Sequence, residues 1–188
     1  MKTPAIVDQA GRSSTAALQP TSKAALWQRL ALARRWWLVP LTAFLVTRLI
    51  VLAAGYLGEI ALPGNVGPDY WHVVPTNLFV DLWARWDSGF YLSIAQQGYS
   101  YSAGAMSNVA FFPVYPLLVN LLSAVTGDAV VAGILVSNAA LLGALLFLYK
   151  LTELEFGDAD TAQRAVFYIA AFPTAVFFSA IYTESTFL

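Results

Sequence analysis

The sequence contains no cysteine and very little charge. Of its 188 residues only 11% are Asp, Glu, Lys or Arg, whereas 59% are hydrophobic. The missing cysteines exclude disulfides, thiolate metal sites and cysteine nucleophiles. So few charges cannot cover a water-soluble domain, in which about a quarter of the residues are usually charged. These two absences predict a protein whose solvent is largely lipid.

Several function classes have no sequence support. The net charge is −1, and no basic run is interleaved with aromatic residues, which argues against nucleic-acid binding. The sequence has no glycine-rich phosphate loop and no His, Asp and Glu cluster with metal-ligand spacing. We therefore expect no bound cofactor, although a divalent ion is compatible with the sequence.

The charges that are present divide the chain into two regions. Residues 1–37 contain six basic residues and one acidic residue, whereas residues 59–128 contain five acidic residues and only Arg85 as a base. Basic flanks stay in the cytoplasm, so we expect the N-terminus inside and the long segment outside. Residues 1–22 are predicted to be a disordered tail. Residues 23–37 are predicted to form a basic amphipathic helix, either on the membrane surface or simply solvated.

Apolar segments predict several membrane spans. They cover about 38–57, 129–151 and 164–178, and another span would start before the chain ends at Leu188. The first has the length that a hydrocarbon core of about 30 Å requires. A signal peptide is the alternative there, but its apolar region would be shorter. Because the last apolar run has no terminating signal, the chain looks C-terminally truncated. The expected fold is an all-α, polytopic membrane protein with an external loop over 59–128.

The external loop holds the residues best suited to chemistry. A helical stretch over 77–97 would place Asp81 and Arg85 on one face, where they can pair, and Asp87 and Tyr91 on another. Its tryptophans would hold this helix at the membrane surface, so Asp87 could meet both water and lipid-borne substrates. The alternative for Asp87 is a solvated loop carboxylate. The alternative for the other pair is a structural ion pair.

A few polar residues lie in apolar surroundings. Arg48 falls inside the first predicted span, where a charge must be functional or paired. Glu184 is an acid in an apolar run, and it either binds substrate or serves in capping and packing. Asn138 is expected to form an interhelical hydrogen bond. Tyr99 and Tyr115 would either line a lipid groove or anchor the protein at the interface.

Three sequence blocks follow one another along the chain. They are RWDSGFYLSIAQQGY at 85–99, AFFPVYPLL at 110–118 and FPTAVFFSAIYTESTFL at 172–188. Each is weak to moderate alone, but together, in this order and spacing, they resemble the PIG-V mannosyltransferases. Enzymes of this family add the second mannose during GPI-anchor assembly, and they have prokaryotic relatives. The resemblance covers roughly residues 40–188 and omits the family's later spans.

The resemblance implies a GT-C architecture, in which many spans surround a large first external loop. Its catalytic acid near the membrane surface corresponds to Asp87, which would act as general base. The donor would be a polyprenyl-phosphate sugar, usually mannose, and the acceptor a lipid or glycan hydroxyl. Arg85 or Arg48 would bind the departing phosphate, and Glu184 and Tyr91 are further substrate-binding candidates.

The residues alone leave two questions open. The segment 111–126 could be an interfacial helix or a span; its prolines leave about a dozen clean apolar residues, and the resemblance favours the interfacial helix. The chain could also be a non-catalytic membrane protein, such as a transporter fragment or an assembly scaffold, or an inactive truncated transferase. Its composition favours a bacterial plasma membrane, with the endoplasmic reticulum as the alternative.

Overall fold

The computed structural model describes residues 35–61, 73–74 and 77–188, and residues 36–188 form one compact unit. Over these ranges the regular elements are all helices and none is a strand, which confirms the predicted all-α class. The predicted tail, and the predicted amphipathic helix up to residue 34, lie outside the described residues.

Among the described residues, two helices are long and apolar enough to cross a membrane. They are α2 (Leu38–Ala61) and α6 (Ala129–Phe156), with lengths of about 36 and 42 Å at 1.5 Å per residue. Both begin at the predicted residue and extend past the predicted end. Only 17% of the most apolar window of α2 is buried, so α2 is not the core helix of a soluble domain. Both helices are consistent with a membrane protein.

The third predicted span takes a different form. Helix α7 (Ala159–Ala171) has 13 residues, or about 20 Å, and is followed by a short 3-10 helix, η1 (Pro173–Val176). Phe172 is extended, as expected before a proline, because the proline ring disfavours helical backbone in the preceding residue. A continuous helix over 164–178 is therefore not formed.

The connection between α6 and α7 is much shorter than residues 152–163, the interval left between the second and third predicted spans. Gly157, with φ 65°, ends α6 in the left-handed conformation that favours glycine. Asp158 then caps α7, accepting hydrogen bonds from the backbone N–H groups of Asp160 and Thr161. A glycine cap and an aspartate cap in succession turn the chain within two residues.

The described part of the predicted external loop contains three helices. They are α3 (Leu78–Asp81), α4 (Ser88–Gln97) and α5 (Val114–Thr126). The single helix expected over 77–97 is thus divided by a turn at 82–87. Helix α5 has 13 residues, or about 20 Å, which is too short for a hydrocarbon core of about 30 Å. This length agrees with the interfacial alternative rather than with a span.

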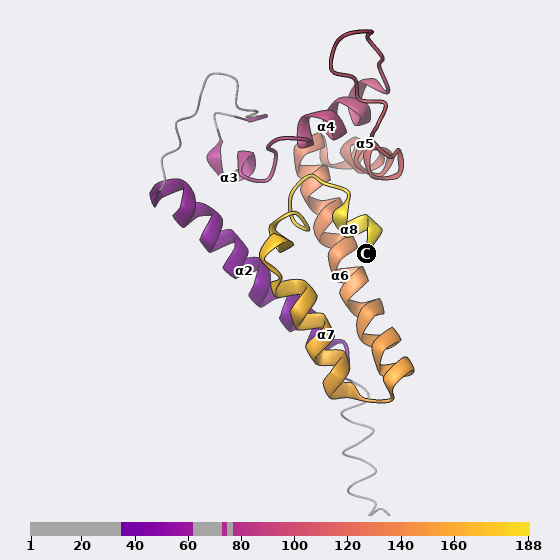
Figure 1. Ribbon diagram of the computed structural model, residues 1–188. Helices are drawn as coiled ribbons and strands as arrows, with labels where there is room; N and C mark the ends of the chain where they lie inside the picture. The colour runs from indigo at the N-terminus through magenta and orange to yellow at the C-terminus, as the bar shows by residue number, and fades with distance from the viewer. Residues whose placement is uncertain (1–34, 62–72, 75–76) are drawn as a thin grey trace, which may run out of the picture. The chain divides into compact units, whose positions relative to one another are not determined.

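The helices pack around two clusters of buried residues. Helices α2, α6 and α7 contact one another around Ala43, Leu141 and Val166, and Figure 1 shows α2 and α6 running in opposite directions. Helices α4 and α5 lie together where α6 begins, and α8 (Glu184–Phe187) packs against α6. The segment between α2 and α6 and the α6–α7 turn are therefore at opposite ends of the long helices.

The chain before α8 lies close against α6 because α6 presents small residues there. A Cβ atom added to Gly133 would lie 2.9 Å from Ile181 Cγ2, so no larger residue fits without movement. One turn later, the Ser137 hydroxyl donates to the Ala180 carbonyl at 2.6 Å. This contact fixes the end of the chain beside α4 and α5.

Candidate functional site

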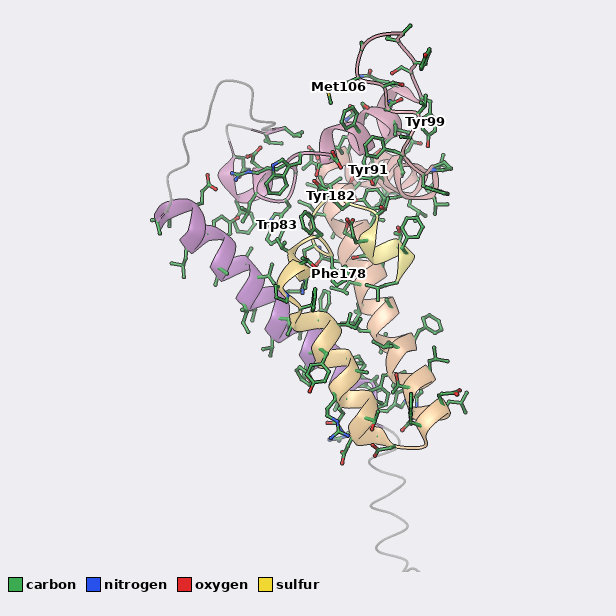
Figure 2. All side chains as sticks on the ribbon, viewed as in Figure 1. Trp83, Tyr91, Tyr99, Met106, Phe178 and Tyr182 are labelled. Carbon is green, nitrogen blue, oxygen red and sulfur yellow. The ribbon has the colours of Figure 1, made fainter. Side chains whose placement is uncertain are left out.

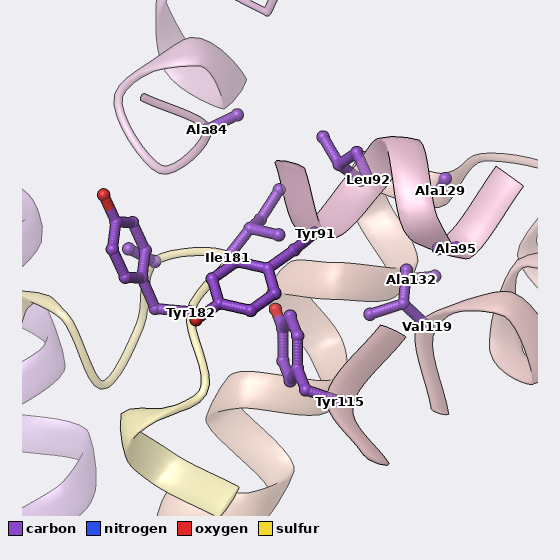
Figure 3. Packing of buried hydrophobic residues seen from close by; sticks show 11 residues of the cluster. Ala84, Tyr91, Leu92, Ala95, Tyr115, Val119, Ala129, Ala132, Ile181 and Tyr182 are labelled. Carbon is purple, nitrogen blue, oxygen red and sulfur yellow. The ribbon is translucent and has the colours of Figure 1, made fainter. Parts of the chain in front are cut away.

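The three sequence blocks meet around one side chain, Tyr91. Its ring centroid lies 5.0 Å from that of Phe111, 5.4 Å from that of Tyr115 and 6.0 Å from that of Tyr182. All three contacts are edge-to-face, a favourable geometry worth about 0.5–1.5 kcal/mol per pair. Figures 2 and 3 show Tyr91 and Tyr182 beside each other, with Tyr115 below them in the close-up. The blocks are distant in sequence but form one cluster.

The tyrosine hydroxyls in this cluster have internal partners. Tyr91 Oη shares a hydrogen bond with Thr183 Oγ1 at 3.2 Å, and Tyr115 Oη donates to the Gly133 carbonyl at 3.0 Å. Burial raises the pKa of both tyrosines, so both stay neutral near pH 7. Tyr115 is fully buried, which excludes the predicted roles of groove lining and interfacial anchor. Tyr91 joins α4 to the third block.

A strained turn precedes Asp87. Trp86 has φ 52°, and among the described residues it is the only one other than glycine with a positive φ. For a bulky residue this conformation costs on the order of 1–3 kcal/mol and persists only where the surroundings hold it. The Tyr182 hydroxyl accepts the Asp87 N–H at 3.1 Å and donates to the Arg85 carbonyl at 3.3 Å. The residues on both sides of Trp86 are thus tied to the same oxygen.

Asp87 stands at the N-terminus of α4 with an exposed side chain. Its carboxylate makes no capping hydrogen bond and no ion pair within the part of the chain that the structure describes. The backbone on both sides is held, while the carboxylate faces outward. This combination suits a group that must exchange a proton with an external hydroxyl.

Glu184, the first residue of α8, belongs to the same site. Its pKa is raised above the ordinary glutamate value, chiefly by burial and in addition by the negative charge of Asp87. Burial, with smaller contributions from both carboxylates, also raises the pKa of Tyr182 to about 12. The first and third blocks therefore bring two acids into one electrostatic neighbourhood. Across the described ranges, no three His, Asp or Glu side chains are grouped to hold a metal ion.

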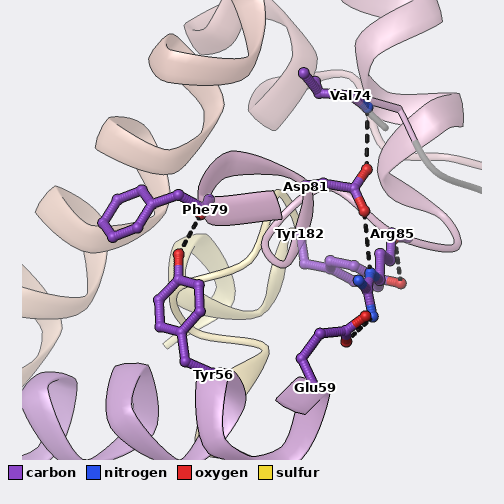
Figure 4. A network of polar contacts seen from close by, with 7 residues as sticks. All are labelled: Tyr56, Glu59, Val74, Phe79, Asp81, Arg85 and Tyr182. Carbon is purple, nitrogen blue, oxygen red and sulfur yellow. Dashed lines mark hydrogen bonds and ion pairs between the residues drawn. The ribbon is translucent and has the colours of Figure 1, made fainter. Parts of the chain in front are cut away.

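Arg85 is held between two acids, as Figure 4 shows. Its Nη1 lies 2.9 Å from Glu59 Oε2, and its Nε lies 3.3 Å from Asp81 Oδ2. The predicted Asp81–Arg85 pair is confirmed. Asp81 is only 1% exposed and also accepts the Val74 N–H at 3.0 Å, so it is a buried charge rather than one on an open helix surface. Arg85 thus ties the turn before Asp87 to the end of α2.

Arg48 is paired with main-chain carbonyls. Its Nη1 donates to the Ala175 carbonyl at 2.7 Å and to Ser179 Oγ at 2.9 Å, and its Nη2 donates to the Ala170 carbonyl at 2.9 Å. These acceptors lie on both sides of the break at Pro173. None of its hydrogen bonds reaches Asp87, so the structure does not bring Arg48 into the cluster around Tyr91.

Two further predicted positions have clear surroundings. Asn138 accepts the Ser179 hydroxyl at 3.0 Å. The predicted bond was interhelical, but Ser179 lies in the turn between η1 and α8 rather than in a helix. Tyr99 is exposed and donates to the Phe111 carbonyl at 2.6 Å. It borders a shallow, mostly apolar recess of about 450 Å³ whose other lining residues are Val109, Ala110, Phe111, Phe112 and Pro113.

Sequence reasoning missed three contributors: Glu59, Trp86 and Tyr182. Tyr182 lies inside the third block, but its contact with the Trp86 turn spans 95 residues, and no local spacing reveals it. Glu59 was weakly indicated by the sequence, because an acidic residue at the end of an apolar helix is expected to pair with a cation. The sequence around Trp86 does not indicate a left-handed backbone, because glycine or asparagine would be expected at a position with that conformation.

Comparison with known proteins agrees with the three blocks. Residues 63–188 match a family model described as Mannosyltransferase (PIG-V). A GPI mannosyltransferase 2 from Drosophila pseudoobscura pseudoobscura is 32% identical over 116 residues, which cover 55% of this chain and 24% of that protein. A GPI mannosyltransferase 2 from Drosophila melanogaster is 29% identical over 169 residues, which cover 76% of this chain and 36% of that protein.

The chain spans only about a quarter to a third of the length of these two relatives. No solved structure matches it.

Proposed function

The chain belongs to the PIG-V mannosyltransferase family, and we propose that it carries the catalytic loop of an enzyme that transfers mannose from a polyprenyl-phosphate donor to an acceptor hydroxyl. The acceptor would be a lipid or a glycan. The observation that carries this proposal is the meeting of all three blocks around Tyr91, with Asp87 and Glu184 beside it.

In the proposed reaction Asp87 acts as general base. The acceptor oxygen bonds to the anomeric carbon, the bond from that carbon to the phosphate oxygen breaks, and polyprenyl phosphate leaves with the electron pair. The proton of the acceptor hydroxyl passes to the Asp87 carboxylate. Such a base contributes about 10²–10⁴ in rate. Exposure of the carboxylate on a fixed backbone supports this role.

Glu184 is proposed to hold a sugar or acceptor hydroxyl. Its raised pKa, caused first by burial and then by Asp87, favours the protonated form more than for an ordinary glutamate. A carboxyl group of this kind can donate as well as accept a hydrogen bond, which suits a polyhydroxyl ligand. A glutamate with a raised pKa beside a second carboxylate is also typical of sites that move protons.

The departing phosphate needs a cation, and Arg85 is the better of the two arginines considered. Its Nη2 is buried and has no hydrogen-bond partner within the described residues, so the side chain would have to move to bring this atom to a phosphate. Arg85 lies two residues before Asp87. Glu59 and Asp81 would then share the Arg85 guanidinium with the phosphate. Arg48 has both terminal nitrogens bound to protein acceptors, which favours a structural role.

The proposed site lies on the outer or lumenal face of the membrane, at the end of α2 and α6 that carries the long loop. Both relatives are animal proteins, so they give no support to a bacterial plasma membrane. The endoplasmic reticulum membrane of a eukaryotic cell is the proposal that agrees with their source.

A transport or scaffold function remains the competing proposal. Transport favours ionisable residues near the middle of broken helices. Arg48 is ionisable and lies near the middle of α2, but α2 is continuous and the guanidinium is bound to the backbone around the break at Pro173. Asp87 and Glu184 lie instead near α4 and α5, where surface chemistry is favoured.

The deciding experiment is Asp87→Asn in the natural protein that carries this chain. The amide keeps the size of the side chain but cannot take up a proton at neutral pH. We expect the rate of mannose transfer to fall by about 10²–10⁴, or roughly 3–5 kcal/mol of barrier. The assay follows radiolabelled mannose from a polyprenyl-phosphate donor in membranes, normalised to protein amount.

Asp160→Asn is the matched control, because Asp160 is an exposed aspartate on α7, far along the chain from the site. Asp81→Asn is unsuitable as a control, because Asp81 is buried and its loss should destabilise the protein. Wild-type transfer by the Asp87 variant would remove the general-base role. Equal losses in the Asp87 and Asp160 variants would point to a general effect of charge.

A further inference from the structure

We propose that Tyr182 is the positioning residue for Asp87: its hydroxyl holds the left-handed turn at Trp86 from both sides and so fixes the direction of the carboxylate. This inference rests on the proposed role of Asp87 as the base. It adds a residue from the third block that acts through the backbone rather than on the substrate.

A single oxygen makes both bonds. Tyr182 Oη accepts the N–H of Asp87 at 3.1 Å and donates its own proton to the carbonyl of Arg85 at 3.3 Å. These two groups flank Trp86 on either side. The hydroxyl therefore uses its donor and one acceptor position to close a ring around one residue, which phenylalanine could not do.

Trp86 has no local reason to adopt this conformation. A tryptophan with φ 52° is an outlier, whereas glycine or asparagine would accept that backbone readily. Trp86 is 53% exposed, and its ring centroid lies 6.3 Å from that of Phe177, so side-chain packing is partial. Main-chain bonds from the Ser88 N–H to the Arg85 carbonyl at 3.2 Å and from the Gly89 N–H to the Trp86 carbonyl at 3.3 Å also cross the turn. The Tyr182 hydroxyl is the side-chain contact that opposes its relaxation.

Tyr182 is itself rigidly placed. Its ring lies 5.2 Å from that of Phe177 and 6.0 Å from that of Tyr91, and the side chain is buried. The preceding Ile181 N–H donates to the Trp83 carbonyl at 2.9 Å, a main-chain bond between the same two segments. The hydroxyl is thus presented to the turn from a packed support.

Asp87 follows the turn directly, so relaxation of Trp86 would redirect its Cα–Cβ bond. A displacement of about 1 Å at a catalytic group can cost about 10² in rate. The expected effect of losing the hydroxyl is therefore on the chemical step. Substrate binding through other groups should change little.

The test is Tyr182→Phe in the natural protein, measured as separate kcat and KM values for mannose transfer. We expect kcat to fall by about 10–100-fold with KM nearly unchanged. In the same background, Trp86→Asn should restore part of the lost kcat, because asparagine adopts the left-handed conformation unaided. Tyr56→Phe is the matched control: it removes a tyrosine bond to a main-chain carbonyl, that of Phe79 at 2.7 Å, and should keep wild-type kcat.

A second readout does not depend on activity. These 188 residues contain no cysteine, so Asp87→Cys gives a unique site for a nitroxide spin label once any cysteine elsewhere in the natural protein is replaced by serine. We expect the label to be less mobile with tyrosine at 182 than with phenylalanine. Equal mobility of the label in both proteins would overturn the proposed positioning role of Tyr182.

The outcomes separate the two proposals. If Asp87→Asn abolishes transfer while Tyr182→Phe keeps wild-type kcat, the positioning role is overturned and the proposed function stands. If Asp87→Asn stays active, the proposed function fails, and the spin label alone decides whether Tyr182 holds the turn. If Tyr182→Phe does not accumulate, recovery in the Trp86→Asn double variant supports the positioning role, and failure of that variant too overturns it.

Discussion

Replacing Arg48 by leucine should change membrane insertion and folded stability in opposite directions. Arg48 lies near the middle of α2, where an arginine costs about 2.5–3.5 kcal/mol on the insertion scale and a leucine gains about 0.3–0.6. Insertion of an isolated α2 segment should therefore improve by about 3 kcal/mol. A fall in insertion would contradict its assignment as a membrane span.

The folded protein should lose stability instead. The guanidinium bonds to the carbonyls of Ala170 and Ala175 and to Ser179 Oγ, at distances of 2.7–2.9 Å. Hydrogen bonds to a charged group contribute about 1.5–3 kcal/mol each, and they do not add fully. Carbonyls left unpaired at membrane depth have no water to replace the guanidinium. We expect a net loss of about 3–6 kcal/mol for Arg48→Leu, and a smaller loss for Arg48→Lys, whose single ammonium cannot reproduce the fork.

Two measurements read the two effects separately. Insertion is the fraction of an α2 reporter segment glycosylated during synthesis, and stability is the unfolding midpoint of the chain in detergent micelles titrated with dodecyl sulfate. Thr42→Val on the same helix is the control, because within the described residues the Thr42 hydroxyl bonds only to the Val39 carbonyl one turn earlier. It should change stability by less than about 1 kcal/mol. If the Arg48→Leu chain is as stable as the wild type, the guanidinium does not stabilise the fold by pairing with the carbonyls around the break at Pro173.

Two further predictions concern topology and pH. A cysteine at Ala103, in the loop, should react with an impermeant thiol reagent from outside, whereas one at Ala159 should not; labelling of both, or of Ala159 alone, would reverse the proposed catalytic face. Burial and the charge of Asp87 raise the pKa of Glu184, so the folded state holds a proton that the unfolded chain has released. The free energy of unfolding should therefore fall as the pH rises from the ordinary glutamate pKa through the raised value. The unfolding midpoint of Glu184→Gln should lack this slope, and an unchanged slope would exclude Glu184 as its source.

The sequence predicted where the long helices begin better than where they end. Helices α2 and α6 start at the residues where apolar character starts, but both continue past it, since α6 includes the polar turn up to Phe156. A helix can continue past the end of an apolar segment, because its backbone hydrogen bonds can also form where the helix is in water. The start of α7 at Ala159 was readable from the Gly157–Asp158 pair, a helix end followed by an N-cap.

The site was predictable where its logic is local. The Asp81–Arg85 pair follows from a four-residue spacing, but its burial does not, because Glu59 and Val74 complete it from other segments. The left-handed Trp86 turn follows from no pattern in its own neighbourhood. Its explanation lies in the distant Tyr182 hydroxyl, and only the folded chain brings the two together.

The close approach of Gly133 to Ile181 has an evolutionary consequence. An alanine at 133 would put its methyl group 2.9 Å from Ile181 Cγ2, and the main-chain bond from Ile181 to Trp83 keeps that backbone from retreating. Which residues are tolerated at position 133 therefore depends on the residue at position 181. Lineages that acquire a side chain at 133 should carry a shorter residue at 181, so the two positions should covary as a size-compensating pair although α6 and the end of the chain are far apart in sequence.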